Sequence, residues 1–419
     1  MAAAVDYNRY DPFAPEMQQN PFPWYAALRE NAPVWRHPAT GIVFVSSHAA
    51  VSRVMADTTT FSSRFASQPT SAGGETATQI REIEKQGWPR LPTMLTEDPP
   101  LQTRYRKTVG RAMSTRRILA LEGKMRELTD EILDTWPARG RVDVMNTLSI
   151  PLPIRVIGHF LCMKPDVFPH VKRWSDASVA GLGAMITDAE RIDAARSVVE
   201  MQKYWASEFN ARLAAPTDDL LSALTQAEFE DETGAERRLN MPEMISIIQQ
   251  LMVAGNETTT KVINETFRML LENPQWFARL QAEPSIINGL VDEALRISTP
   301  NQGMFRFVMR DTELDGVKIP KGATIWLMFG SANRDASVFP QPDEFDPLRP
   351  NLKESVAFGK GAHFCIGAPL ARLELKVAFE QVAKRCESIA LPAGFKFSYE
   401  PSYILRGLAA LELDVVKRA

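Results

Sequence analysis

The sequence predicts a mainly helical protein with a minor β region, folded as a single domain over residues 1–419. Between Arg104 and Lys203, apolar residues recur at the period of amphipathic helices. The same period over Glu243–Leu270 predicts one long helix, whereas strand patterns are confined to a hairpin near the N-terminus, Met304–Leu327 and the C-terminal residues. No stretch has the composition of a linker, so we expect no boundary between domains.

Turn and capping residues define the elements before the long helix. Pro38 and Gly41 favour a hairpin, and glycines and prolines interrupt every period between Phe61 and Thr96. A long irregular segment of this kind is either a functional lid or a disordered loop. The predicted elements are an irregular arm over 1–20, a helix over Phe22–Glu30, a hairpin of Val34–His37 with Ile42–Ser46, a helix over Ser47–Met55, the irregular segment, a helical series reaching Leu213, a short helix capped by Asp218 and Asp219, and a polar surface loop over Glu228–Asn240.

The remaining elements follow from similar signals. Asn273 followed by Pro274 is typical of a helix start, and glycines at 316 and 322 indicate turns between short strands. The predicted elements are two helices within Asn273–Ser298, the strands of Met304–Leu327, a proline-rich meander over Pro340–Pro350, an amphipathic helix over Ala368–Cys386 and short C-terminal strands.

Composition excludes several classes of protein. A net charge of −3 gives no global attraction to nucleic acid. The three cysteines (162, 365 and 386) are odd in number and lack paired spacing, which favours a reducing compartment and argues against disulfides or a zinc site. The N-terminus has no apolar run that could serve as a signal peptide or membrane span. We therefore expect a soluble, cytoplasmic, monomeric protein without membrane contact.

One segment, Phe358–Gly367, carries the strongest chemical signal. Its single thiol, Cys365, stands between Gly361 and Gly367, which let the backbone turn tightly and approach a flat ligand. The predicted helix from Ala368 places the sulfur near a helix N-terminus, where negative charge is favoured. On residue type alone, a lone cysteine is more often a small buried hydrophobic residue.

The flanking residues change that interpretation. Phe358, Gly361, His363, Cys365 and Gly367 form Phe-x-x-Gly-x-His-x-Cys-x-Gly, which closely resembles the haem-thiolate loop of cytochromes P450. The resemblance implies that Cys365 is the axial ligand of haem b iron. It also implies that the other four residues contact the cofactor, with His363 bound to a propionate.

The long helix contains a second motif that breaks local rules. Gly255 costs about 1 kcal/mol relative to alanine, and three threonines follow Glu257. A kink made by threonine back-bonding, with Glu257 exposed, would explain this without function. However, Ala254-Gly-x-Glu-Thr-Thr resembles the P450 distal-helix motif. That resemblance implies dioxygen as co-substrate, Thr258 as the hydroxyl beside it and Glu257 as the acid behind. Ala254 and Gly255 are expected to keep the helix slim enough to lie across the haem.

Further residues match the family in order along the chain. Arg106 and Arg306 match arginines that bind propionates, and Gln102 stands where many relatives have histidine. Taken singly, each arginine could be a surface charge. Glu293 and Arg296 match the structural Glu-x-x-Arg motif of the family, and Arg349 is the expected partner of this motif. The resemblance implies that these three residues hold the core and the meander below the haem.

Two residue sets are predicted for partners. Arg104, Lys107 and Arg111 lie on one helical stripe that either docks an acidic ferredoxin or is an ordinary solvated face. The resemblance places the irregular segment from Phe61 to Thr96 over the substrate, and residues 80–96 of this segment are predicted to line the pocket. The predicted pocket also includes Val179–Met185, Gln250, Val253, Gln302, Gly303, Met304 and Ile404.

The resemblance spans most of the chain and implies a bacterial-type cytochrome P450 monooxygenase. It would hydroxylate an apolar terpenoid-like, steroid or aromatic molecule, with electrons from NAD(P)H through ferredoxin reductase and ferredoxin. A non-catalytic thiolate-haem protein, such as a gas sensor, would share the cysteine loop but would not need Glu257 and Thr258. A helical binding protein without cofactor is the other alternative.

Overall fold

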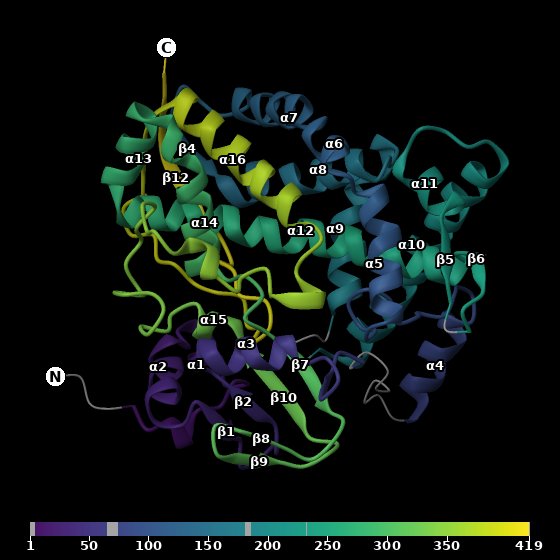
Figure 1. Cartoon of the computed structure of the whole chain (residues 1–419). Helices are drawn as coiled ribbons and strands as arrows, with labels where there is room; N and C mark the ends of the chain where they lie inside the picture. Colours follow the sequence, from purple (N-terminus) through teal and green to yellow (C-terminus); the bar gives the residue numbers. More distant parts are fainter. Residues whose placement is uncertain (1–4, 65–73, 181–185, 232, 419) are drawn as a thin grey trace. The chain divides into compact units, whose positions relative to one another are not determined.

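The computed structural model describes residues 5–64, 74–180, 186–231 and 233–418 (Figure 1). The chain forms two compact units. The first comprises Met1–Ser62, Glu122–Pro153 and Thr258–Ala419, and the second comprises Ser63–Leu121 and Ile154–Glu257. Because each unit is assembled from separate stretches of chain, no single linker divides them. The prediction of one continuous domain stays a prediction.

The first unit contains a mixed sheet in the order β1-β2-β10-β7-β3. Strands β1 and β2 form the predicted antiparallel hairpin, β10 runs parallel to β2, and β7 lies antiparallel to β10. The strands of the first unit are β1 (Val34–Arg36), β2 (Val43–Val45), β3 (Phe61–Ser62), β4 (Arg139–Asp143), β7 (Gly303–Val308), β8 (Thr312–Leu314), β9 (Val317–Ile319), β10 (Thr324–Met328), β11 (Cys386–Ala390) and β12 (Glu412–Lys417).

Alternation along these strands divides the core between the two faces of the sheet. Val43 and Val45 pack with α3 (His48–Ala56), while Phe44 between them packs in an aromatic cluster on the opposite face. The same alternation places Leu327 with α3 and Trp326 in the aromatic cluster. This is the two-residue period of a sheet covered on both faces.

Helices form the rest of the first unit, and α16 lies beside α7 and α14 (Figure 1). The α-helices are α1 (Pro15–Gln19), α2 (Phe22–Asn31), α3, α7 (Glu122–Asp134), α13 (Pro274–Ala282), α14 (Ile287–Ser298), α15 (Phe329–Ala332) and α16 (Ala368–Arg385), with short turns at Tyr7–Arg9, Met145–Ser149, Pro284–Ile286, Leu352–Glu354 and Gly361–His363. Asn273 precedes α13 as predicted, but its side chain makes no capping bond there and donates to the Met269 carbonyl instead.

The second unit is almost entirely helical. It contains α4 (Gly74–Glu84), α5 (Leu101–Ala112), α6 (Thr115–Leu119), a turn at Pro165–Val167, α9 (Phe168–Val179), α10 (Asp188–Ala214), α11 (Leu220–Gln226) and a small hairpin of β5 (Glu228–Glu230) with β6 (Glu236–Arg238). Two helices cross the boundary between the units, α8 (Pro151–Phe160) and the long α12 (Met241–Glu272). Within the described residues, no helix is long and apolar enough to span a membrane.

Several sequence-based expectations were wrong, and the first is the irregular arm over 1–20, which contains α1. Residues 74–84 of the predicted irregular segment form α4, while residues 65–73 lie outside the described part of the chain. Helix α4 buries no residue, so it shows no core-facing apolar stripe. The predicted loop over Glu228–Asn240 contains the β5–β6 hairpin, in which polar residues surround Phe229. Strand β4 was missed because only Val142 of it is buried.

Helix α16 carries a buried acid, which makes stability depend on pH. Glu374 is 2% exposed, its Oε1 has no hydrogen-bond partner among the described residues, and burial raises its pKa to about 8. The folded protein therefore keeps this proton at pH values where the unfolded chain has lost it. The free energy of unfolding should fall as pH rises from about 4.5 to about 8.

Replacing Glu374 with glutamine should remove this pH dependence. We expect Glu374→Gln to raise the free energy of unfolding by about 1–3 kcal/mol at pH 8 and by much less at pH 5. Denaturant unfolding at the two pH values measures the difference. An equal change at both would show that the buried carboxyl does not titrate as described.

Candidate active site

The cysteine loop, residues Phe358–Gly367, begins in a turn and ends where α16 starts. The Cys365 amide donates to the Phe358 carbonyl at 2.8 Å, which closes the loop. Gly361 has φ +68°, and a Cβ there would lie 3.2 Å from the Met55 carbonyl oxygen. A Cβ on Gly367 would lie 3.8 Å from Cys365 Sγ. The glycines therefore give the loop the backbone shape that the sequence motif predicts.

Side chains of the cysteine loop and of strand β7 have the chemistry that haem binding requires. Cys365 is half-buried and lies three residues before Ala368, the first residue of α16, so its thiol is near a helix N-terminus, which favours a negatively charged sulfur. Arg306 on β7 is 4% exposed, and its Nη1 donates to the Phe305 carbonyl at 2.7 Å. A buried guanidinium suits a propionate, and half-buried His363 adds a second donor in the loop. The first unit thus contains the cysteine and two of the side chains that the sequence predicts as haem ligands, and their binding of the cofactor stays a prediction.

Phe358 has a defined packing role. The Arg372 guanidinium of α16 lies 4.7 Å from the centre of its ring, and the Phe364 ring lies 6.3 Å away. Arg372 also pairs with Asp292 of α14 at 2.7 Å. These contacts fix the start of the cysteine loop against α14 and α16.

The motif of α12 lies within regular helix. Ala254 is exposed and Thr258 is half-buried, whereas Glu257 is only 9% exposed. Gly255 serves a different purpose from the one the sequence suggested. A Cβ there would lie 2.9 Å from Ile157 Cδ1 of α8, so Gly255 allows close helix packing while Ala254 provides the slim, open face.

Lys172, which no sequence motif indicates, is ion-paired with Glu257, the acid of this motif. Lys172 Nζ on α9 lies 3.6 Å from Glu257 Oε1, and Lys172 also pairs with Asp176. Asn256 Nδ2 donates to Ser175 Oγ of the same helix at 2.7 Å. The carboxylate of Glu257 is therefore bound by a cation from α9. No local pattern joins Lys172 to α12, since only the tertiary fold brings them together.

Helix α5 carries the second-unit residues predicted to bind propionates. Arg106 is half-buried and Gln102 is 1% exposed, with its Oε1 accepting from Thr103 Oγ1 at 3.2 Å. The neighbouring Tyr105 donates to Glu243 at the start of α12 at 2.7 Å. Glu243 also pairs with Arg237 at 2.7 Å, and hydrogen bonds from these partners keep the pKa of Glu243 low despite its burial. This network fixes α5 to α12.

The predicted pocket residues have different surroundings. Val253 is half-buried, and Gln250 donates from Nε2 to Thr93 Oγ1 at 2.6 Å. Gln302 is 1% exposed and donates to the Thr299 carbonyl at the end of α14 at 2.6 Å. A Cβ on Gly330 of α15 would lie 2.3 Å from Gln302 Oε1. These contacts give Gln302 a packing role between α14 and α15.

Three further pocket predictions lie in or beside the first-unit sheet. A Cβ on Gly303 would lie 2.2 Å from the Leu327 carbonyl, so glycine allows β7 to pair closely with β10. Met304 and Ile404 are partly buried against the two clusters of the sheet. Residues 181–185 of the predicted Val179–Met185 segment lie outside the described residues. A substrate role for all these residues stays a prediction.

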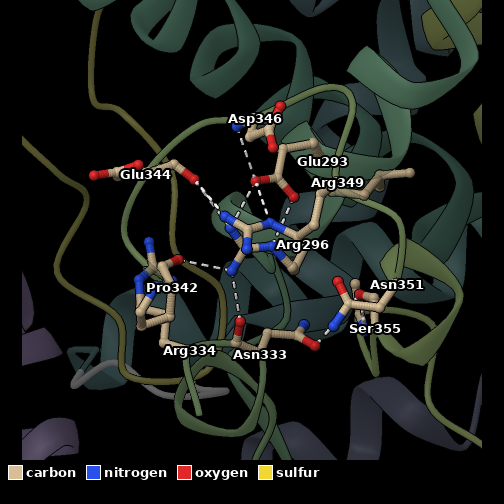
Figure 2. Close-up of polar contacts among 12 residues, drawn as sticks. Glu293, Arg296, Asn333, Arg334, Pro342, Glu344, Asp346, Arg349, Asn351 and Ser355 are labelled. Carbon is tan, nitrogen blue, oxygen red and sulfur yellow. Dashed lines mark hydrogen bonds and ion pairs between the residues drawn. The ribbon is translucent and has the colours of Figure 1, made fainter. Parts of the chain in front are cut away.

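Glu293, Arg296 and Arg349 are in contact, as the sequence predicts (Figure 2). Glu293 accepts from Arg296 at 2.7 Å and from Arg349 at 3.2 Å, and both Glu293 and Arg296 are 0% exposed. The arginines also donate to meander carbonyls, including that of Glu344. Figure 2 shows the two guanidinium groups converging on Glu293 and on these carbonyls. The cluster therefore ties α14 to the meander.

The predicted docking stripe is only partly available. Arg104 is ion-paired with Glu230 of β5 at 2.7 Å and also donates to the Asp231 carbonyl. Lys107 and Arg111 are exposed on α5. Lys360 of the cysteine loop pairs with Glu354 at 3.4 Å. Two cations of the stripe thus remain exposed, while Arg104 holds the β5–β6 hairpin.

Comparison with known proteins agrees with this geometry. The Cytochrome P450 family model matches residues 186–405. The chain is 31% identical to Vitamin D(3) 25-hydroxylase of Pseudonocardia autotrophica over 98% of both chains. It is 32% identical to Steroid C26-monooxygenase of Mycobacterium tuberculosis, over 88% of this chain and 87% of the relative.

A solved structure extends the agreement to the fold. The structure of cytochrome P450 CYP109Q5 from Chondromyces apiculatus has a TM-score of 0.85 and 32% identity, covering 99% of this chain and 100% of the other. The mainly helical fold agrees with these matches. The chain therefore belongs to the cytochrome P450 family of monooxygenases, with haem b as cofactor and dioxygen as co-substrate.

Proposed function

We propose that this enzyme hydroxylates an apolar molecule of steroid or terpenoid size. The observation that carries the proposal is the exposed, slim face of α12 at Ala254, with Thr258 and the Lys172-bound Glu257 beside it. A gas sensor would not require this acid and hydroxyl. The names of two relatives, a vitamin D(3) hydroxylase and a steroid monooxygenase, support the substrate class.

Each residue has a proposed task. Cys365 binds the iron as thiolate, and Arg106, Arg306 and His363 bind the propionates. When bound, the haem supplies the iron that activates dioxygen for insertion of one oxygen atom into a C–H bond.

The distal residues handle protons. The Thr258 hydroxyl donates a proton to the reacting oxygen. The Glu257 carboxyl then gives its own proton to Thr258 and takes up another from solvent. Lys172 Nζ orients the Glu257 carboxylate between these transfers. Phe358, Gly361 and Gly367 shape the thiolate loop, and Gln102 supports α5.

A spectral screen tests the substrate class. The haem-loaded protein should shift from low to high spin with steroid or terpenoid probes and much less with small polar compounds. Probes that shift the spectrum should then stimulate NAD(P)H consumption and give a hydroxylated product in the presence of ferredoxin and its reductase. Binding without any product across the panel would favour the gas-sensing alternative.

We further propose that a ferredoxin docks at Lys107 and Arg111, the exposed cations of α5. Lys107→Glu/Arg111→Glu should slow the first electron transfer from an acidic ferredoxin about tenfold at low salt, and the deficit should shrink at high salt. The charge-matched control is Arg196→Glu/Lys203→Glu on exposed positions of α10. Equal rates in wild type and the α5 variant at low salt would exclude this docking site.

The three cysteines, which lack paired spacing, support a cytoplasmic location for the enzyme and its ferredoxin.

A further inference from the structure

The segment from Gly87 to Thr93 is held by side chains rather than by secondary structure. It follows α4 in the second unit and forms neither helix nor strand. Pro89 and Pro92 have no backbone N–H, so the segment has few groups for backbone pairing. Three side chains of two helices bind the segment instead, namely Gln202 of α10 and Ser246 and Gln250 of α12.

Gln202 binds both backbone polar groups of Trp88. Its Oε1 accepts from the Trp88 amide at 3.0 Å, and its Nε2 donates to the Trp88 carbonyl at 3.0 Å. Gln202 is 5% exposed, so both bonds are shielded from water. A Cβ on the preceding Gly87 would lie 2.1 Å from Gln202 Oε1. The pairing therefore requires glycine at 87 for reasons of space.

The other end of the segment is bound to α12. The Leu91 amide donates to Ser246 Oγ at 3.0 Å, and Gln250 Nε2 donates to Thr93 Oγ1 at 2.6 Å. Ser246 is 3% exposed and Thr93 is 0% exposed. Gln250 lies one turn before the exposed Ala254, so the second anchor borders the open face of α12.

We propose that Gln202, Ser246 and Gln250 are positioning residues for the substrate. Together they form a clamp that sets the path of residues 88–93 from α10 at one end and α12 at the other. The proposal rests on the proposed function for one point, that the substrate lies at the open face of α12, which the Gln250 anchor borders. Because the clamp consists of buried hydrogen bonds, loss of one anchor frees the segment without touching the haem residues.

Hydrogen exchange tests the clamp without any substrate. In haem-loaded Gln202→Ala, exchange at the Trp88 amide should rise about tenfold or more, since its acceptor is gone. Gln202→Glu keeps an acceptor for the Trp88 amide but loses the donor to the Trp88 carbonyl, so it should restore only part of the protection. Gln249→Ala is the matched control, because Gln249 is also 5% exposed but binds Ser178 of α9. Unchanged Trp88 exchange in Gln202→Ala, or an equal rise in the control, would overturn the clamp.

A double-mutant cycle tests the contact between Gly87 and Gln202. Gly87→Ala should deprotect the Trp88 amide because the new methyl group displaces the Gln202 amide. In the Gln202→Ala background the same change should add little, since the clashing group is absent. Fully additive effects would show that Gly87 and Gln202 act independently and would contradict the proposal.

Probe binding tests the positioning role. With testosterone and vitamin D3 as probes, Gln202→Ala should change the ratio of their spin-shift dissociation constants about fivefold or more. For a probe that the enzyme converts to product, Gln202→Ala should change KM more than kcat. If exchange rises but the ratio stays that of wild type, the clamp exists but does not position substrate. If wild type binds neither probe, the proposed substrate class fails, while the exchange results still decide the clamp.

Discussion

Replacing Glu293 with alanine is expected to lower the free energy of unfolding by about 3–5 kcal/mol. The change leaves the guanidinium of Arg296, which is 0% exposed, without its carboxylate, and it removes an acceptor from Arg349. Uncompensated buried charge is costly because the interior cannot solvate it. A loss of this size is a large part of the roughly 5–15 kcal/mol that stabilises a folded protein.

The preceding residue of α14 provides the control. Asp292 pairs with Arg372 at 2.7 Å, but the side chains are 34% and 43% exposed. Asp292→Ala should therefore cost no more than about 1 kcal/mol. Denaturant unfolding of both variants in the haem-loaded state measures the difference. Similar small losses for both would show that burial of the Glu293 cluster contributes little to stability.

The second large effect is expected at the proton-handling residues of α12. Glu257→Gln and Thr258→Val should each lower product formation by about 10²–10⁴-fold, the usual contribution of positioned proton transfer. Substrate affinity should change little, because neither substitution alters the size of the side chain much. NAD(P)H consumption should fall less than product formation, so the two reactions become uncoupled.

Thr260→Val is the control for a threonine change in the same helix turn. Thr260 is half-buried and has no assigned proton task. Product per NAD(P)H should stay near the wild-type value in this variant. If Glu257→Gln and Thr258→Val behave like Thr260→Val, proton delivery must follow another route. Lys172→Met should give an intermediate loss, since Glu257 would keep its carboxylate but lose the Nζ partner at 3.6 Å.

The sequence predicted those elements that carry a strong local or motif signal. The hairpin of β1 and β2 has the turn residues Pro38 and Gly41 between two apolar runs, and α12 keeps its apolar period over many turns. The Glu293 cluster was predictable because a family motif gave both Arg296 and the distant Arg349. Conversely, α4 and the β5–β6 hairpin bury too little apolar surface to leave a pattern.

Contacts between distant residues set the limit of prediction for the site. Lys172 meets Glu257 only through the packing of α9 on α12, and Gln202 meets Trp88 only through the path of an irregular segment. The sequence predicts Gln302 as a pocket residue but gives no sign that its amide donates to the Thr299 carbonyl at the end of α14. Side-chain direction at such positions depends on tertiary packing, which no periodicity encodes.

The central claim is that Cys365 supplies the thiolate ligand of the haem. The spectrum of the reduced carbon-monoxide complex tests it most directly, because a strongly red-shifted Soret band reports a thiolate ligand. Wild type should show this band, and so should the control Cys162→Ser, which changes another half-buried thiol. Cys365→Ala should lose it. Survival of the red-shifted band in Cys365→Ala would contradict the assignment of the site.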